Sequence, residues 1–157
     1  MFVLSVSILV LAFIEVSTAS FDTAQCGELI LEAIEECSAA VEGLGAAFSN
    51  LDLDAYCMSW EQLRSCKKDL VNCEPFYIID GLCGNKVMLN KAKRQKGCIF
   101  RAVEELHGEI ANCESTGNVC SLFQGALECQ IEPISAACGD EALEVLEFLL
   151  ETAKNRC

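Results

Sequence analysis

Twelve cysteines constrain this chain more than any other feature of its sequence. They are an even number in 157 residues, and the closest pairs, Cys66 with Cys73 and Cys113 with Cys120, are seven residues apart. No Cys-x-x-Cys is present, so the pattern indicates neither a thioredoxin-like redox site nor half of a zinc site. We therefore expect six disulfides and no metal, in a chain exported to an oxidising compartment. The cysteines are Cys26, Cys37, Cys57, Cys66, Cys73, Cys83, Cys98, Cys113, Cys120, Cys129, Cys138 and Cys157.

The amino-terminal sequence predicts export. An apolar core from Phe2 to Ile14 is followed by Ser17-Thr18-Ala19, small residues of the kind that signal peptidase accepts. The alternative is a membrane anchor, but a segment of thirteen residues, ended by Glu15, is too short to span a hydrocarbon layer of about 30 Å. We predict a signal peptide at residues 1–19 and a secreted, extracellular chain without a membrane span. The remaining residues, 20–157, are expected to form a single cysteine-rich domain.

Apolar residues recur at helical spacing through most of the mature chain. Residues 29–44 form one amphipathic pattern, and residues 53–73 form a second that follows Asp52 or Asp54 as N-cap. Residues 86–113 form a third.

Two more helices are predicted near the carboxyl terminus. One lies between Val119 and Ile134 and ends or bends at Pro133, and the other starts at Asp140 as N-cap. The apolar spacing of the last helix predicts that Glu144, Glu147 and Glu151 face outward and that five residues face inward: Ala142, Val145, Leu146, Leu149 and Ala153. The stretch "EPFYIIDGLCGN" before the third helix is expected to be a looser connection, and no run alternates for long enough to indicate a strand. We predict an all-α fold, a disulfide-stapled array of about five helices.

Cysteine spacing indicates how these helices are joined. Each residue turns a helix by about 100°, so Cys57 and Cys66, nine residues apart, point to opposite sides. The same step separates Cys120, Cys129 and Cys138. We expect such a helix to be bonded to two different neighbours, each bridge contributing about 2–4 kcal/mol. The pairing stays undetermined, because twelve cysteines allow on the order of ten thousand connectivities.

The segment "NKAKRQKGCIFR", residues 90–101, holds five of the 11 basic residues of a chain with a net charge of −13. On a helix, the basic residues gather opposite an apolar stripe, and Glu104, Glu105 and Glu109 follow them. This order of charges is the reverse of what the helix dipole favours. The stripe consists of Met88, Ala92, Ile99, Val103, Leu106 and Ile110.

Three interpretations of the basic residues remain. They form a solvated helix face whose charge is balanced by the acidic stripes of the first and last helices, or they bind an anionic partner. Screening over about 8 Å allows a local cationic patch to act within an acidic protein. The third interpretation is protease cleavage after Arg94, which an ordered helix would disfavour. The possible partner-binding patch consists of Lys86, Lys93, Arg94, Lys96 and Arg101.

Catalytic chemistry is not indicated. The single histidine, His107, has no second histidine with which to share a metal, and no Gly-x-Ser-x-Gly surrounds a serine. The acidic residues at helical spacing are interpreted as a solvated face. Outside the basic segment the chain is acidic, which disfavours nucleic acid as a partner. We expect neither enzyme activity nor a cofactor.

Three segments carry a resemblance: "YCMSWEQLRSCKKDLVNC", "GCIFRAVEELHGEIANC" and "AACGDEALEVLEFLLETAKNRC". Together they resemble a secreted cysteine-rich domain that is expanded in nematodes and has no assigned function. Related helical cysteine domains occur in chondroitin proteoglycan-type proteins. The resemblance covers residues 26–157 and implies a secreted, all-disulfide helical domain without implying an activity.

We predict that the chain acts by binding an extracellular protein or matrix component. One alternative is a carrier of a small apolar ligand, which would need an apolar cavity of several hundred Å³. The other is a venom or salivary effector, which the tissue of expression would distinguish.

Overall fold

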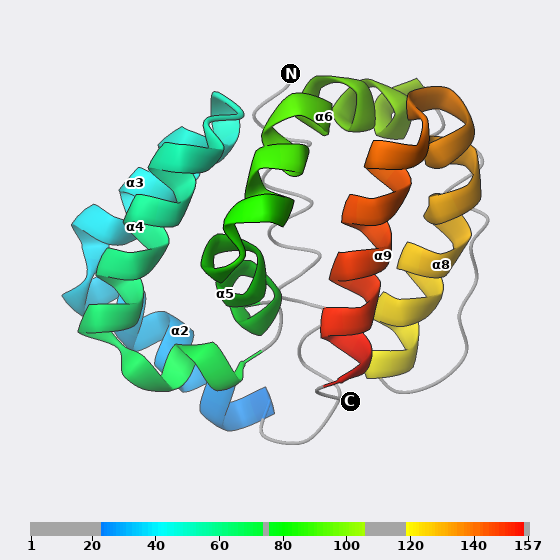
Figure 1. The fold of residues 1–157 in the computed structure, drawn as a ribbon. Coiled ribbons are helices and arrows are strands. Elements are labelled where there is room, and N and C mark those ends of the chain that lie inside the picture. Colours follow the sequence, from blue (N-terminus) through cyan, green and yellow to red (C-terminus); the bar gives the residue numbers. More distant parts are fainter. Residues whose placement is uncertain (1–22, 74–75, 106–118, 156–157) are drawn as a thin grey trace. The chain divides into compact units, whose positions relative to one another are not determined.

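The structure is a computed structural model, and it describes residues 23–73, 76–105 and 119–155. Every regular element in these ranges is a helix, so the predicted all-α class is confirmed (Figure 1). The number of helices is higher than the expected five. The elements are α2 (Thr23–Glu36), α3 (Ser38–Ser49), α4 (Leu53–Cys66), the 3-10 helix η2 (Lys68–Asn72), α5 (Phe76–Gly84), α6 (Lys86–Glu105), α8 (Val119–Cys138) and α9 (Asp140–Lys154).

The chain divides into two compact units, residues 1–80 and residues 81–157. The single-domain range 20–157 stays a prediction.

The first predicted helix is in fact two helices, α2 and α3. They meet at Cys37, whose φ of −119° and ψ of 30° lie outside the helical region. The bend lies at a disulfide-bonded residue, because Cys37 is bonded to Cys66 at the end of α4. The apolar spacing stays helical through this point, so periodicity alone did not reveal the break.

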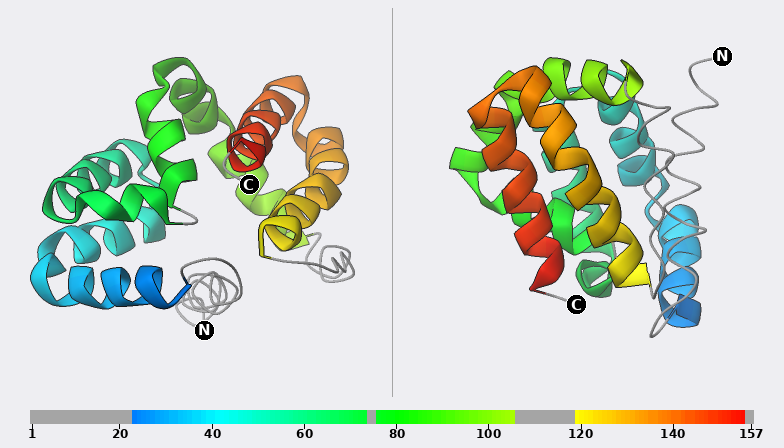
Figure 2. Two further views of the ribbon diagram at one scale, coloured as in Figure 1. Left: turned by 90° about the horizontal axis from the view of Figure 1, so that it is seen from below. Right: turned by 90° about the vertical axis from the view of Figure 1, so that its right-hand side faces the viewer.

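Helices α3 and α4 form a closely packed antiparallel pair (Figure 2). Small residues on α3 allow the approach: Ala40 and Ala47 are buried, and a Cβ atom added at Gly43 would lie 2.6 Å from Ser59 Oγ on α4. A short turn closes one end of the pair, with Leu51 at a φ of 52°. The side chain of Asp52 then accepts a hydrogen bond from the Ala55 N–H at 3.0 Å, which confirms the predicted N-cap.

The second predicted helix ends earlier than expected. Lys67 leaves the helix with a φ of −129° and a ψ of 87°, and η2 follows. The ammonium group of Lys67 is 2.8 Å from a carboxylate oxygen of Glu32 and 2.8 Å from a carboxylate oxygen of Glu36, and both glutamates lie on α2. Beyond this break, Cys73 is 2% exposed and forms a disulfide with Cys26 near the start of α2. An ion-pair cluster and a disulfide therefore both join α2 to the segment after α4.

Trp60 of α4 is the largest buried side chain of the first unit, at 2% exposed. Its ring stacks on Phe76 with centroids 5.5 Å apart, and its Nε1–H donates to Asp80 at 3.0 Å. Asp80 also accepts from Arg64 at 2.6 Å. Phe76 and Asp80 belong to α5, so the prediction of a loose connection here is wrong. The apolar residues of α5 pack against the rest of the protein, as the buried Tyr77 shows.

The second unit contains α6, α8 and α9, with α8 and α9 side by side and α6 packed against both (Figure 2). Its described core centres on Ile134, which is fully buried against Ala102 of α6 and Leu146 of α9. A disulfide between Cys98 and Cys138 joins α6 to the end of α8. Helix α8 continues through Pro133, so it does not end there as one prediction allowed. The buried residue and the disulfide that follow the proline hold this last turn in place.

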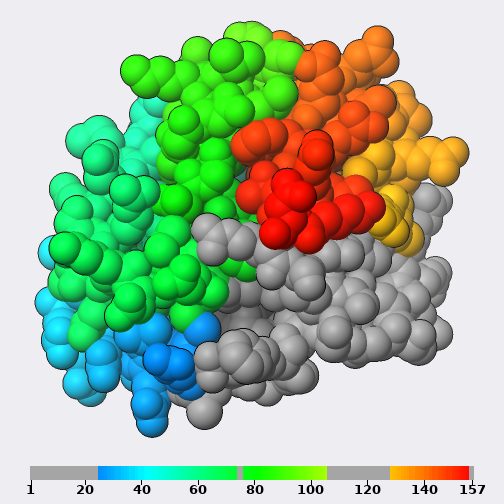
Figure 3. All heavy atoms as spheres, turned by 60° about the horizontal axis from the view of Figure 1, so that its bottom comes forward, coloured from blue at the N-terminus to red at the C-terminus, as the bar shows by residue number. Residues whose placement is uncertain are grey.

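Helix α9 is the element that the sequence predicted best. Four of the five residues predicted to face inward, Ala142, Val145, Leu146 and Ala153, are buried, and Glu144, Glu147 and Glu151 are exposed as predicted. The fifth, Leu149, is only half-buried, and its neighbour Leu150 is buried instead. The space-filling view shows its side chains directly against those at the end of α8 (Figure 3). The predicted N-cap was one residue late. Gly139 holds that position with a φ of 87°, a conformation that favours glycine, and Asp140 is the first helical residue.

The disulfide-stapled architecture is also confirmed. Each of the nine cysteines whose side chains the structure describes is disulfide-bonded, Cys57, Cys83 and Cys129 among them. Two bridges, Cys26 with Cys73 and Cys37 with Cys66, lie within the first unit, and Cys98 with Cys138 lies within the second. The side chains of the remaining three, Cys113, Cys120 and Cys157, fall outside the described residues.

Candidate binding surface on helix α6

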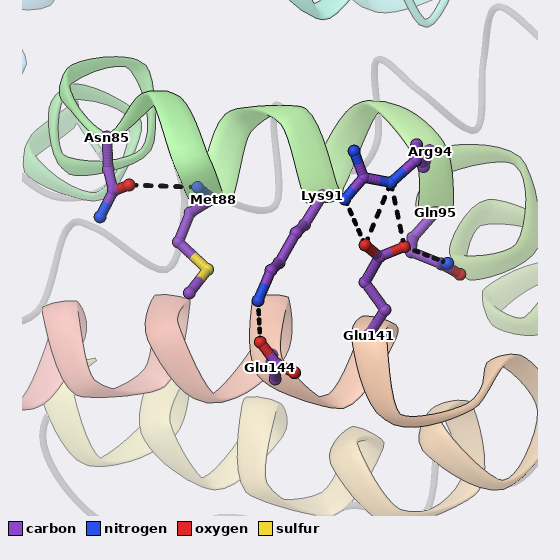
Figure 4. Close-up of polar contacts among 7 residues, drawn as sticks. All are labelled: Asn85, Met88, Lys91, Arg94, Gln95, Glu141 and Glu144. Carbon is purple, nitrogen blue, oxygen red and sulfur yellow. Dashed lines mark hydrogen bonds and ion pairs between the residues drawn. The ribbon is translucent and has the colours of Figure 1, made fainter.

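All five residues of the predicted partner-binding patch lie on α6. The helix begins after Asn85, whose Oδ1 accepts a hydrogen bond from the Met88 N–H at 3.1 Å (Figure 4). Sequence reasoning missed this cap, although an asparagine directly before a helical pattern is its usual signal. The basic stretch is therefore ordered helix from Lys86 to Glu105. Because proteases need an extended segment, this conformation disfavours cleavage after Arg94 in the folded chain, and cleavage stays a prediction.

One side of α6 packs into the second unit as the apolar stripe predicted. Ala92 is buried, and Ile99 and Val103 pack against the cluster around Ile134. Two residues of the predicted stripe, Leu106 and Ile110, fall outside the described residues, as do His107 and Glu109.

Three residues of α6 reach the acidic side of α9 (Figure 4). Lys91 forms an ion pair with Glu144. The guanidinium of Arg94 donates two hydrogen bonds to Oε1 of Glu141, one from Nε at 3.0 Å and one from Nη2. Nε2 of Gln95 donates to the other carboxylate oxygen of Glu141 at 2.8 Å. The prediction that the acidic stripe of the last helix balances part of the basic stretch is confirmed by these contacts.

These contacts change the acidity of the groups involved. The hydrogen bond from Arg94, followed by that from Gln95, lowers the pKa of Glu141 to about 2. The same hydrogen bond raises the pKa of the Arg94 guanidinium. Both groups are therefore ionised at physiological pH, and the pair persists across the pH range of extracellular fluids. Glu141 and Gln95 were not singled out from the sequence, because charge order along one helix does not identify partners on another.

The opposite side of α6 faces solvent. We call it the outer face and define it by its exposed residues Lys86, Asn90, Arg94, Gly97 and Arg101. The other two residues of the predicted patch, Lys93 and Lys96, are half-buried. The structure thus divides the patch: Arg94 is shared with α9, Lys86 and Arg101 point outward, and the remaining two lie on the flank.

The two units differ in charge. Residues 20–80 contain twelve acidic and three basic residues, whereas residues 81–157 contain eleven acidic and eight basic residues. Six of those eight lie between Lys86 and Arg101. The basic character of the protein is therefore concentrated on α6.

The first unit has further surface features. A shallow, open hollow of about 470 Å³ lies on α4, and the described residues that line it are Met58, Glu61, Gln62 and Ser65. On α2, Leu31 and Ile34 are 65% and 47% exposed, with nothing to show what covers them. Within the described residues, no cluster of side chains is suited to hold a metal ion. No helix of the described ranges is long and apolar enough to cross a membrane.

Comparison of the chain with protein-family models, with curated proteins and with solved structures gave no match. The resemblance to the nematode-expanded cysteine-rich domain rests on cysteine placement and stays a prediction.

Proposed function

We propose that this chain is secreted and works as a binding protein for an extracellular protein or matrix component, without catalysing a reaction. The observation that carries the proposal is the outer face of α6, where three exposed basic residues, Lys86, Arg94 and Arg101, lie in a row on an acidic protein. Such a row is not required by helix stability, because it precedes Glu104 and Glu105 in the order that opposes the helix dipole. Because α9 already supplies Glu141 to Arg94, a partner that supplies negative charge is a reason for the other two basic residues of the row, Lys86 and Arg101.

The disulfides support an extracellular location. Cross-linked cysteines persist in oxidising compartments and are rare in the cytosol, so nine bonded cysteines fit export through the secretory pathway. The disulfides also hold the helices at fixed positions, which reduces the ordering cost of binding through a preformed surface.

A carrier of a small apolar ligand is supported less well. Pockets for such ligands enclose most of the surface of the ligand, whereas the hollow on α4 is shallow and open to solvent. Neither a venom nor a salivary role is favoured by a particular surface.

Secretion can be tested by expressing the full chain in eukaryotic cells and measuring the mass of the protein in the medium. We expect removal of residues 1–19 and no reaction of the folded protein with a thiol reagent. Retention inside the cell, or a large amount of reactive thiol, would contradict the proposal.

Binding can be tested with the same secreted protein on a surface of cell-deposited matrix. The native chain is compared with the double variant Lys86→Glu/Arg101→Glu, and with the control Lys68→Glu, which changes an exposed lysine of η2. We expect retention of the native chain and of the control, and loss of the double variant. Equal retention of all three proteins would show that the outer face does not carry binding, and no retention of any would oppose a matrix partner.

A further inference from the structure

We propose that the outer face of α6 binds a linear sulfated polysaccharide, and that Gly97 is the point at which this chain approaches the helix most closely. This inference rests on the proposed function, since it names the class of partner. It is carried by the juxtaposition of an exposed, uncovered glycine with basic residues one turn before it and one turn after it on the same face.

Three basic residues, Lys86, Arg94 and Arg101, lie in a row along the outer face. Successive members of the outer face are three or four residues apart, the spacing at which side chains lie above one another on one side of a helix. At 1.5 Å per residue, Lys86 and Arg101 are about 22 Å apart along the axis. A row of this length suits an extended polyanion better than a single small anion, which would contact one or two side chains only.

Gly97 has no packing reason among the described residues. It is exposed in the middle of a helix of 20 residues, and an added Cβ atom would meet no described heavy atom within 4 Å. Glycine at such a position destabilises a helix by about 1 kcal/mol relative to alanine. Gly43 differs, because a Cβ atom at that position would collide with Ser59. At Gly97 the helix backbone is exposed to solvent without a covering side chain. Arg94 lies three residues before it and Arg101 lies four residues after it. A ligand can therefore sit closer to the helix there than at any side chain of the row.

Arg94 can take part while it stays paired with Glu141. Its contacts with Glu141 use Nε and Nη2, and Figure 4 shows the other terminal nitrogen pointing away from that carboxylate. The planar guanidinium can therefore hold Glu141 on one edge and a sulfate oxygen on another. In this arrangement Glu141 fixes the orientation of Arg94 before the ligand arrives.

The acidic residues around the outer face favour a single extended chain over a globular protein as the ligand. Glu104 and Glu105 are exposed at the end of α6, and Glu144 of α9 lies beside it. A globular acidic protein would bring its own carboxylates within the screening length of about 8 Å of these groups and be repelled. A single polysaccharide chain can follow the row and avoid them. Nucleic acid fits less well, because the outer face carries no aromatic side chain on which bases could stack.

The first experiment uses glycine variants of the full secreted protein, with heparin and chondroitin sulfate as probes. We expect Gly97→Ala to raise the melting temperature and to weaken binding at least about threefold, because it improves the helix while filling the point of approach. The matched control is Gly45→Ala. Gly45 is also an exposed helical glycine with open space around it, so this variant should be stabilised similarly and bind normally. If Gly97→Ala binds as well as the native chain, close approach at Gly97 is wrong.

The second experiment tests charge and ligand class. We expect Lys86→Glu/Arg101→Glu to lose about tenfold or more in affinity for heparin and to show a weaker dependence on salt, with Lys68→Glu unchanged. Chemically desulfated heparin should bind poorly. Equal binding of a DNA oligonucleotide, or stronger binding of polyglutamate, would overturn the assignment to a sulfated polysaccharide. If the chain is retained on deposited matrix but none of these variants affects heparin binding, this inference fails while the proposed function stands.

Discussion

The contact between α3 and α4 allows a prediction in which two neighbouring glycines behave in opposite ways. At Gly43 an alanine Cβ would lie 2.6 Å from Ser59 Oγ and 3.3 Å from Ser59 Cβ. At Gly45, two residues further along α3, it would meet no described heavy atom within 4 Å. Both substitutions gain the same helix propensity, about 1 kcal/mol. The difference in unfolding free energy between the two variants therefore isolates the cost of the contact.

That cost can be worked out from the structure. Rotation of the Ser59 hydroxyl can relieve the shorter distance, but Ser59 Cβ is fixed to the backbone of α4. The two helices cannot simply move apart, because the bridge from Cys37 to Cys66 holds one end of the pair and the turn at Leu51 holds the other. Overpacking at such a site costs about 1–3 kcal/mol. We expect Gly45→Ala to stabilise the protein by about 0.5–1 kcal/mol, and Gly43→Ala to be less stable than Gly45→Ala by about 1–3 kcal/mol.

The assay is urea unfolding followed by circular dichroism, with the disulfides intact. A third variant, Gly43→Ala/Ser59→Ala, removes the hydroxyl and should recover only the part of the loss that comes from Oγ, because the contact with Cβ at position 59 remains; Ser59→Ala alone is its control. A double-mutant cycle over these proteins gives the coupling between the two positions directly. If Gly43→Ala and Gly45→Ala are equally stable, the close approach of α3 and α4 described here is wrong.

Three further predictions concern other contacts. Trp60→Phe should lower the unfolding free energy by about 2–3 kcal/mol in the same assay, since it loses both packing volume and the hydrogen bond to Asp80; a loss below about 0.5 kcal/mol would contradict this. Replacing Cys37 and Cys66 together by serine should cost about 3–4 kcal/mol for a separation of 29 residues, and unchanged stability would refute the value. The carboxyl of Glu141 has a pKa of about 2 in the folded chain against an ordinary 4.5, so its contribution is fully present above pH 4.5 and is lost as the pH falls toward 2. Melting temperatures of Glu141→Gln should accordingly fall less steeply over that range than those of the native chain, and identical slopes would rule out the assignment.

Features that depend on neighbouring residues in the chain were predictable from the sequence. The buried stripe of α9 follows from apolar spacing alone, and the cap at Asp52 follows from residue type and position. The charge order along α6 left three interpretations open, and its contacts with Glu141 and Glu144 of α9 support the one in which the last helix balances part of the basic charge.

Features that depend on contacts distant in sequence were not predictable. The bend at Cys37 coincides with its bond to Cys66, 29 residues away. Segment 76–84 lacks a long amphipathic pattern, and it is helical where Phe76 stacks on Trp60. The structure also assigns different roles to the basic residues of α6, because only their surroundings distinguish Arg94, held by α9, from Arg101, which faces solvent.

The pair of helices α3 and α4 is closed into a covalent ring, by a disulfide at one end and by the backbone turn at Leu51 at the other. Cutting the backbone at this turn would open the ring without releasing either helix, since the bridge would still tether them. Leu51 itself adopts a left-handed conformation that a leucine disfavours, so an insertion at this residue that keeps the neighbouring cap at Asp52 would lose little. A fluorophore tag or an affinity peptide can therefore be inserted there, which would give a labelled protein for binding measurements with α6 unaltered.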